Sequence, residues 1–241
     1  MPQKFTRANL EKEMKAAADP VKATGSARYF KTGKGEYGEG DVFLGMTVPV
    51  LRKTALRYRE LALADLERLL ASKIHEYRAA ALEILVVQYK RGSEKQRAEI
   101  VEFYLGSTAG INNWDLVDGS CRPILGEYLM THPRKILRKL ARSANVWERR
   151  IAMVSTMTLV WASDLDDALS IAGMLLEDRH DLIHKAVGWV LREVGRKDQR
   201  RLLEFLETHY DRLPRTALRY AIEHFPLEQR KKMLKGIFRS I

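Results

Sequence analysis

The chain has 241 residues, of which 46% are hydrophobic, so it is long enough to bury a substantial core. Its 42 lysine and arginine residues against 31 aspartate and glutamate residues give a net charge of +11, which favours a polyanionic partner, either nucleic acid or an anionic membrane surface. The single cysteine, Cys121, excludes a disulfide framework and a site built from several thiolates.

The N-terminal residues 1–7 lack the apolar stretch of a signal peptide, and no apolar run of about 18 residues occurs in the chain. We therefore expect a cytoplasmic protein that does not contact a membrane. Residues 27–31, Ala-Arg-Tyr-Phe-Lys, mix bases and aromatics as nucleic-acid surfaces do. The glycine-rich residues 33–41 have neither the preceding strand nor the Gly-Lys-Ser/Thr ending of a Walker loop, so we expect a mobile connection there.

Apolar residues recur at spacings of three and four along the rest of the chain, for example at Leu66, Leu69 and Leu70. Alternating strand patterns are nearly absent. Helix-ending residues occur at Gly92-Ser93, Gly106-Ser107, residues 143–145, Ser163-Asp164 and Leu213-Pro214, and none of these boundaries resembles a flexible linker. The pattern predicts an all-α chain that forms one domain over residues 1–241.

Trp114 and Asp118 are four residues apart, one helical turn, so their side chains share a helix face. Asn112 is the expected N-cap, and Asp115 falls in the first turn, where its charge suits the helix dipole. Asp115 thus has a structural role, which leaves Asp118 as the candidate functional carboxylate. An aromatic face beside a carboxylate suits a flat cationic group, although such a pair taken alone is more often a core anchor and a surface acid.

Charge alternates in the second half of the chain. Residues 131–160 carry seven lysines and arginines against one acid, Glu148, and residues 161–180 reverse the sign with five acids against Arg179. We interpret this alternation as a directed surface, in which a basic face alternates with an acidic one. Asn145 is the expected cap of a helix that carries Trp147, Arg149 and Arg150. Trp161 has no such basic residues near it in the sequence and is expected in the core.

The helix expected over residues 183–193 carries Trp189 between Lys185 and Arg192 on one face. Gly188 costs this helix about 1 kcal/mol and indicates that another group approaches closely there. His180 and His184 have the spacing of a zinc-binding helix, but Asp replaces the catalytic Glu and no third ligand follows, so we expect no metal. Without a Gly-x-Ser-x-Gly motif, a serine hydrolase is also excluded.

A weak internal repeat relates residues 76–82, 148–154 and 183–189. Its aligned basic residues Arg78, Arg150 and Lys185 have the spacing of two periods and then one period of a helix-pair repeat, as in α-solenoids of HEAT or TPR type. Stacked repeats form a concave surface lined by residues at equivalent positions. The sequence therefore predicts a track on which these three residues contact phosphates.

Five segments, in order, resemble the AlkD family of alkylpurine DNA glycosylases over nearly the whole chain. They are Ala-Arg-Tyr-Phe-Lys from residue 27, Phe-Leu-Gly from 43, Trp-Asp-Leu-Val-Asp from 114, Trp-Glu-Arg-Arg from 147 and His-Lys-Ala-Val-Gly-Trp-Val-Leu-Arg-Glu from 184. The resemblance implies a HEAT-like α-solenoid whose concave basic face holds damaged duplex DNA. It also implies hydrolysis of the N-glycosidic bond of cationic N3- and N7-alkylated purines, without flipping of the base into a pocket.

By motif, the resemblance places the catalytic carboxylate at Asp118, the aromatic walls at Tyr29, Trp114 and Trp189, and the phosphate-holding arginine at Arg150. The longer glycine-rich stretch 33–41 departs from the family pattern close to Tyr29. A cationic purine leaves as a neutral base without a general acid, so one carboxylate suffices to stabilise the oxocarbenium-like sugar and direct a water. We expect Arg78, Arg149, Lys185 and Arg192 to bind DNA as well, in a monomeric, monofunctional enzyme that needs no cofactor and no metal.

Two other functions fit parts of the sequence. A non-catalytic HEAT-like module that binds nucleic acid would need the basic surface but not Asp118. A protein–protein adaptor with acidic partners would explain the charge but not the aromatic residues. Release of a base from alkylated DNA distinguishes the enzyme from both.

Overall fold

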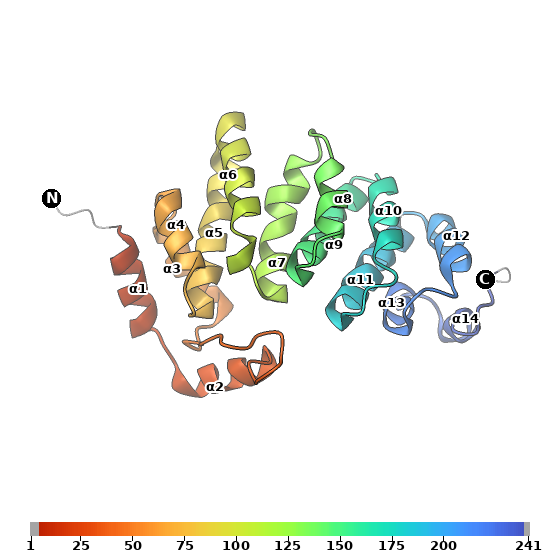
Figure 1. Ribbon diagram of the computed structural model, residues 1–241, viewed down its shortest axis with the longest axis horizontal. Coiled ribbons are helices and arrows are strands. Elements are labelled where there is room, and N and C mark those ends of the chain that lie inside the picture. The colour runs from red at the N-terminus through yellow and green to blue at the C-terminus, as the bar shows by residue number, and fades with distance from the viewer. Residues whose placement is uncertain (1–4, 239–241) are drawn as a thin grey trace. The chain divides into compact units, whose positions relative to one another are not determined.

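A computed structural model describes residues 5–238 of the chain (Figure 1). Within these residues the structure is helical and has no strand, although Val42 and Ile74 form an isolated parallel bridge. The predicted all-α class is confirmed, and the succession of helices is consistent with an α-solenoid. The HEAT-like type of the repeat stays a prediction.

The chain divides into two compact units, Met1–Ile124 and Leu125–Ile241. A single domain over residues 1–241 therefore remains a prediction. Unit 1 contains α1 (Arg7–Ala16), α2 (Pro20–Tyr29), α3 (Val48–Arg57), α4 (Leu63–Leu70), α5 (His75–Arg91), α6 (Glu94–Gly106), the 3-10 turn η1 (Thr108–Gly110) and α7 (Trp114–Cys121).

A π-helical turn, η2 (Arg122–Gly126), links the two units. It contains Pro123, which has no N–H to continue the hydrogen-bond ladder of the preceding helix. Unit 2 then contains α8 (Lys135–Ala141), α9 (Val146–Trp161), α10 (Asp166–Met174), α11 (Asp181–Lys197), α12 (Gln199–His209), α13 (Arg215–Ala221) and α14 (Leu227–Met233).

Side-chain caps mark several of the helix starts in the described residues. Ser93 forms a capping box with Gln96 at the start of α6. The Asn145 side chain accepts a hydrogen bond from the Trp147 N–H at 2.9 Å, as expected for α9. The predicted cap of α7 is wrong by one residue, because Asn113 and not Asn112 accepts from the Trp114 N–H, at 2.8 Å.

The core of unit 1 lies between α4, α5 and their neighbours. The periodic residues Leu66, Leu69 and Leu70 are buried there, as their spacing predicts. In contrast, α2 has no buried residue, and in Figure 1 it lies below α3 and α5 and is turned across their direction. Its position therefore depends on its connections more than on apolar burial.

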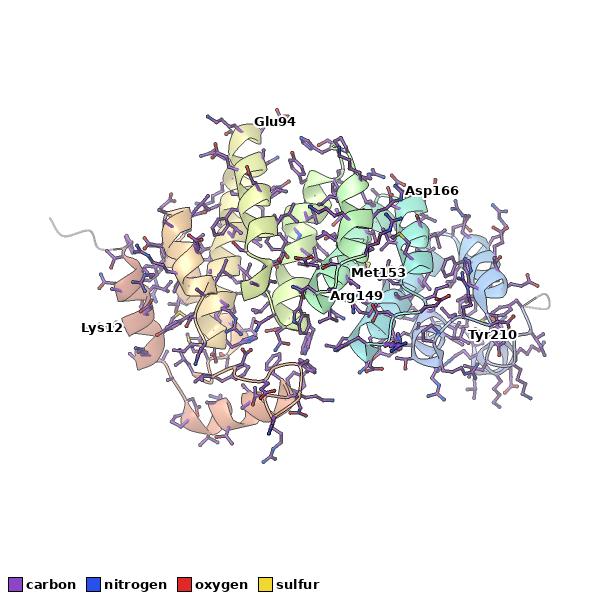
Figure 2. All side chains as sticks on the ribbon, in the orientation of Figure 1. Lys12, Glu94, Arg149, Met153, Asp166 and Tyr210 are labelled. Atoms are coloured by element: carbon purple, nitrogen blue, oxygen red, sulfur yellow. The ribbon has the colours of Figure 1, made fainter. Side chains whose placement is uncertain are left out.

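The core of unit 2 is built on α9, which packs against α8, α10 and α11. Met153, labelled in Figure 2, is fully buried in it. The prediction for Trp161 is wrong: it ends α9 and is 48% exposed. Among the described residues no helix is long and apolar enough to span a bilayer.

Candidate functional site

Trp114 and Asp118 both lie in α7, one turn apart, as their spacing predicts. Trp114 is the first residue of the helix, and both side chains are half-buried. The backbone carbonyl of Asp118 accepts a hydrogen bond from Arg122 Nε at 3.2 Å. The helix therefore presents an aromatic ring and a carboxylate together at the surface of unit 1.

The ring of Trp114 belongs to an aromatic cluster, which consists of Tyr29, Phe30, Phe43, His75 and Trp114. Phe30 stacks on Trp114 at 5.3 Å between ring centroids, and the edge of Tyr29 meets the same indole at 5.8 Å. Tyr29 is 65% exposed. The structure thus brings two of the three predicted aromatic walls, Tyr29 and Trp114, into contact in unit 1.

Sequence reasoning missed Phe30 and Phe43 as members of the cluster, although both occur in the motifs of the family resemblance. Their rings lie nearly parallel, 5.2 Å apart. Phe43 stacks on the imidazole of His75 at 4.6 Å, and Phe30 lies 5.0 Å from it. The available signal was aromatic content alone, which does not reveal that residues 30, 43, 75 and 114 meet.

His75 bridges two carboxylates behind these rings. Its Nε2 lies 2.8 Å from Asp115 Oδ2, and its Nδ1 lies 3.2 Å from Asp41 Oδ2. Asp115 occupies the first turn of α7, as predicted, so its carboxylate both suits the helix dipole and fixes α7 to the start of α5. Sequence reasoning gave no role to His75 or Asp41.

Arg78 completes this buried network. Its Nη2 donates to Asp41 Oδ2 at 2.6 Å, its Nη1 donates to the Ser72 carbonyl at 2.7 Å, and the residue is 3% exposed. The hydrogen-bond partners that this guanidinium has among the described residues are all groups of unit 1. We therefore assign Arg78 to the support of the site in place of the expected phosphate contact.

Burial and charge act in opposite directions on this network. Burial favours the neutral imidazole of His75, but the hydrogen bonds to Asp115 and Asp41 outweigh it and raise the pKa of His75 above 6.5. Burial likewise acts to raise the pKa of Asp41, but the hydrogen bond from His75 and the charge of Arg78 lower that pKa below 3.8. The raised pKa of His75 and the lowered pKa of Asp41 both favour an imidazolium between two carboxylates.

Glu76, next to His75, holds the Phe43-Leu44-Gly45 segment. Its buried carboxylate accepts hydrogen bonds from the backbone N–H groups of Leu44 (2.9 Å), Gly45 (2.8 Å) and Met46 (3.3 Å). Gly45 has φ +80°, and a Cβ there would collide with the Asp19 carbonyl at the start of α2. The Asp19 N–H donates to the Leu44 carbonyl at 2.8 Å, so this segment anchors α2, which ends at Tyr29.

The glycine-rich residues 33–41 form consecutive turns. Glu36 Oε2 accepts from the Gly33 N–H and Glu39 Oε2 from the Gly35 N–H, both at 2.8 Å. Carboxylates therefore occupy amides that a phosphate-binding loop presents to its ligand, in agreement with the absence of a Walker motif. The segment ends at Asp41, in the network of His75 and Arg78.

A pocket of about 200 Å³ lies beside the aromatic cluster, between α2, α3, α5 and α7. Its mainly apolar lining includes Phe30, Phe43, Leu51 and Leu82, with the Asp115 carboxylate at one side. Among the described residues its lining contains neither Trp114 nor Asp118. Asp118 therefore does not line this pocket, and its side chain is half-buried.

In unit 2, the basic and acidic runs pair with each other. Arg134 lies 3.1 Å from Asp167, and it also pairs with Asp164. Arg149, labelled in Figure 2, binds Asp178 and donates to the carbonyls of Ser143 (3.0 Å) and Ala144 (2.9 Å). The alternation of charge thus stabilises unit 2 internally, which corrects its interpretation as a directed surface.

The other predicted DNA-binding residues of unit 2 also have partners. Arg150 is 5% exposed, and its Nη1 donates to the Leu182 carbonyl at 2.5 Å. The ammonium of Lys185 lies 2.7 Å from Asp181, one turn earlier in α11. Arg192 pairs with Glu223. Phosphates would therefore compete with carboxylates at Lys185 and Arg192.

Gly188 is explained by α13 and not by a ligand. A Cβ at this position would lie 2.5 Å from both the Ala217 carbonyl oxygen and the Tyr220 Cβ. The following residue, Trp189, is half-buried.

His180 caps α11 from outside the helix, and His184 is bonded to the Asp178 carbonyl. No cluster of three or more His, Cys, Asp or Glu suited to a metal ion occurs in the described part of the chain.

Comparison with known proteins identifies relatives of this helical chain. The model of a family described as DNA alkylation repair enzyme matches residues 10–225. Among solved structures, the chain is similar to a predicted DNA alkylation repair enzyme from Enterococcus faecalis, with a TM-score of 0.71 and 18% sequence identity over 87% of this chain and 97% of that chain. At this identity the likeness shows the fold. The comparison with curated proteins gave no significant match.

Proposed function

The chain belongs to the DNA alkylation repair enzyme family, and from this premise we propose that it is a monofunctional glycosylase for cationic N3- and N7-alkylated purines in duplex DNA. Family membership gives it a role in the repair of alkylation damage. The observation that carries the finer proposal is the arrangement on α7, where Asp118 lies one turn from Trp114 and the exposed ring of Tyr29 meets the same indole at 5.8 Å.

The aromatic rings bind the cationic nucleotide. An alkylpurine with a formal positive charge is attracted to the face of an indole or phenol ring by about 0.5–2 kcal/mol for each ring. Tyr29 and Trp114 supply these faces in unit 1, and Trp189, on α11 of unit 2, is the third aromatic residue that the resemblance implies. A neutral purine lacks this attraction, so the aromatic residues favour the damaged base.

Asp118 acts on the sugar. The cationic base is a good leaving group, since it takes the electrons of the N-glycosidic bond and departs neutral. Positive charge then develops on the deoxyribose, and a nearby carboxylate stabilises it electrostatically. The same carboxylate orients a water that attacks C1′, and the water loses a proton to give an abasic site. The absence of a deep base pocket is what the family resemblance implies.

The DNA backbone is bound by basic residues of unit 2. We propose phosphate contacts for Arg150, Lys185, Arg149 and Arg192. On binding, Arg149, Lys185 and Arg192 exchange their carboxylate partners for phosphates, and Arg150 is held in orientation by its bond to the Leu182 carbonyl. Lys185 pairs with Asp181 and serves as a phosphate contact, so the proposed reaction includes no Schiff base and no strand cleavage. The reaction as written uses neither a metal nor a cofactor, and the proposed enzyme acts as a monomer.

The Asp118→Asn variant tests this function. Duplex DNA methylated at purine N3 and N7 is incubated with excess enzyme, and free base is measured over time. We expect wild type and Asp211→Asn, a control at an exposed carboxylate of unit 2, to release base at equal rates. Asp118→Asn should release base at least about 100-fold more slowly, as expected for loss of an electrostatic group at the reaction centre.

The same experiment distinguishes the alternative of a non-catalytic DNA-binding module. Binding of undamaged duplex by Asp118→Asn should stay within about twofold of wild type, because the carboxylate acts on the sugar cation and not on the backbone. Tight binding by wild type without release of base would identify the protein as a binding module.

A further inference from the structure

We propose that His75 is a positioning residue of the site, which holds α7 against the segment that follows the glycine-rich turns and does so as an imidazolium. Its effect on catalysis rests on the proposed function, because Trp114 and Asp118 are the groups that it positions. The geometry and charge of His75 do not depend on that function, and they are tested separately.

Donation to a carboxylate from each ring nitrogen requires two protons on the ring. His75 Nε2 lies 2.8 Å from Asp115 and Nδ1 lies 3.2 Å from Asp41, and its side chain is 4% exposed. A neutral imidazole donates through one nitrogen only, whereas an imidazolium donates through both. Ionised carboxylates accept but do not donate. Both contacts are therefore satisfied together when His75 is charged.

The charges that face His75 come from three elements. Asp41 belongs to the connection between α2 and α3, Asp115 to α7, and Arg78 to the next turn of α5, with its Nη2 3.4 Å from His75 Nδ1. The neighbouring Glu76 directs its carboxylate to the backbone of residues 44–46. Two carboxylates thus face two cations. Loss of the imidazolium proton leaves Asp41 paired with Arg78 and removes the cationic partner of Asp115, whose side chain is 29% exposed.

His75 connects this charge network to the residues of the site. Asp115 lies between Trp114 and Asp118 in the first turns of α7. The imidazole face stacks on Phe43. The ring centroid of Phe30 lies 5.0 Å from that of His75 and 5.3 Å from that of Trp114, so Phe30 contacts both. A cationic ring favours such stacking. Displacement of His75 therefore affects both the carboxylate that anchors α7 and the rings that hold Trp114.

The sign of the pH dependence follows from the raised pKa of His75. The hydrogen bonds to Asp115 and Asp41 overcome the opposing effect of burial and raise that pKa above 6.5. The stabilisation by His75 is complete below the unfolded pKa of about 6.5 and is lost as pH rises through the folded value. We expect α7 to loosen on the alkaline side of this transition and not on the acid side.

Histidine NMR tests the charge state directly. In protein labelled with ¹⁵N-histidine, the His75 signals are assigned by their loss in His75→Gln, and the protonation of both ring nitrogens is followed from pH 5.5 to 9. We expect His75 to carry both protons at pH 7, where an unperturbed histidine is mostly neutral. A midpoint at or below 6.5 would overturn the proposal.

Amide hydrogen exchange tests the positioning role. In His75→Gln one neutral amide replaces the two-fold donor, and we expect the amides at residues 116–118 to exchange about tenfold faster at pH 7 than in wild type. The control His132→Gln, which removes a half-buried histidine of unit 2 stacked on Tyr128, should leave them unchanged. Equal protection in His75→Gln and wild type would contradict the proposal. If His75→Gln does not fold, Asp115→Asn takes its place with the same expected result.

The consequence for catalysis is measured on methylated duplex DNA. We expect His75→Gln to release base about tenfold more slowly than wild type at pH 7, with unchanged binding of undamaged duplex. The rate of base release by wild type should fall as pH rises through the midpoint of the His75 titration. This decrease should be absent in His75→Gln. Identical rates and profiles would remove His75 from the site while the glycosylase function stands. Absence of base release by wild type would instead contradict the proposed function, and the NMR and exchange results would still decide the role of His75.

Discussion

At the scale of single residues, the site separates side chains that face solvent from side chains that hold them. Tyr29 is 65% exposed, and Asp118 and Trp114 are half-buried at the surface of α7. Behind them, Glu76 and Arg78 are almost fully buried and use their charges on protein groups. Substitutions in the first group should change function at constant stability, and substitutions in the second group should change both.

Tyr29→Ala illustrates the first group. Loss of an exposed ring should change the free energy of unfolding by no more than about 0.5 kcal/mol. If the ring attracts the cationic lesion by about 0.5–2 kcal/mol, excision of N7-methylguanine should fall by about 2- to 30-fold. Single-turnover rates and thermal melting measure the two effects, with the exposed Val21→Ala on the same helix as control. Unchanged excision by Tyr29→Ala would exclude it as an aromatic wall.

The sequence predicts the first group of residues better than the second. Trp114 and Asp118 are recognisable because one helical turn separates them, and this relation is local. His75 finds its partners 34 and 40 residues away in the sequence, at Asp41 and Asp115. Arg78 was expected at phosphates because its charge is visible in the sequence, whereas its burial against Asp41 is set by tertiary packing.

At the scale of elements, short connections fix the helices that carry the site. α2 has no buried residue and is held through residues 43–46, which bind Asp19 at its start and Glu76 on α5. In unit 2, α11 approaches α13 closely at Gly188. These two contacts hold α2 and α11, the helices that carry Tyr29 and Trp189, although neither contact is made by the ring of Tyr29 or Trp189.

Glu76→Gln should weaken the anchor of α2. A carboxamide retains one acceptor oxygen, so one of the backbone N–H groups of residues 44–46 loses its partner. Loss of a charged hydrogen bond at a buried site costs about 1.5–3 kcal/mol. Denaturant unfolding should show this decrease, and the amides of Leu44 and Gly45 should exchange faster. Glu83→Gln, which removes the more exposed ion pair with Arg52, is the control and should cost less than about 1 kcal/mol. Equal effects of the two variants would argue against the anchor.

Gly188→Ala should destabilise unit 2. The new Cβ would lie 2.5 Å from a backbone oxygen of α13, and overpacking of this kind costs about 1–3 kcal/mol. Gly173→Ala on α10 provides a matched control, since its Cβ would meet Phe205 at an ordinary 4.0 Å. That control should gain up to about 1 kcal/mol from helix propensity. A Gly188→Ala protein as stable as wild type would show that α13 can shift to accommodate the added methyl group without a loss of stability.

Helix boundaries follow from the sequence where a cap is unambiguous. Asn145 caps α9 as predicted, and the helix break predicted at Gly92-Ser93 lies at the start of α6. Asn112 and Asn113 are adjacent and equally good caps by type, and only the extended backbone of Asn113 selects it. The position of Trp161 at the end of α9 is exposed because the apolar packing of that helix stops before it, which periodicity within the helix does not reveal.

At the scale of the whole molecule, the net charge of +11 favours DNA, but many of its cations are paired. Arg134, Arg201 and Arg212, which we do not assign to DNA, each contact a carboxylate within unit 2. The number of phosphates bound is therefore smaller than the number of basic residues suggests. The dependence of affinity on salt concentration measures that number directly.

Arg150→Ala should reduce this dependence by about one phosphate. The slope of log K against log salt for undamaged duplex should become less steep by about 0.9. The variant also loses the hydrogen bond to the Leu182 carbonyl, so a decrease in thermal stability is expected. Lys139→Ala removes a charge from an exposed position on α8 that we have not assigned to DNA, and it serves as control for the loss of net charge. An unchanged slope for Arg150→Ala would place Arg150 away from the DNA.

The most direct measurement for the proposed function is the mass of both products from a duplex that contains a single N7-methylguanine. The proposed function predicts free N7-methylguanine and an intact strand with one abasic site, above the spontaneous loss seen with Asp118→Asn. A strand that keeps its guanine but loses the methyl group would identify direct reversal of the damage and contradict a glycosylase. An unchanged, tightly bound strand would identify a binding module in which Asp118 has no catalytic role.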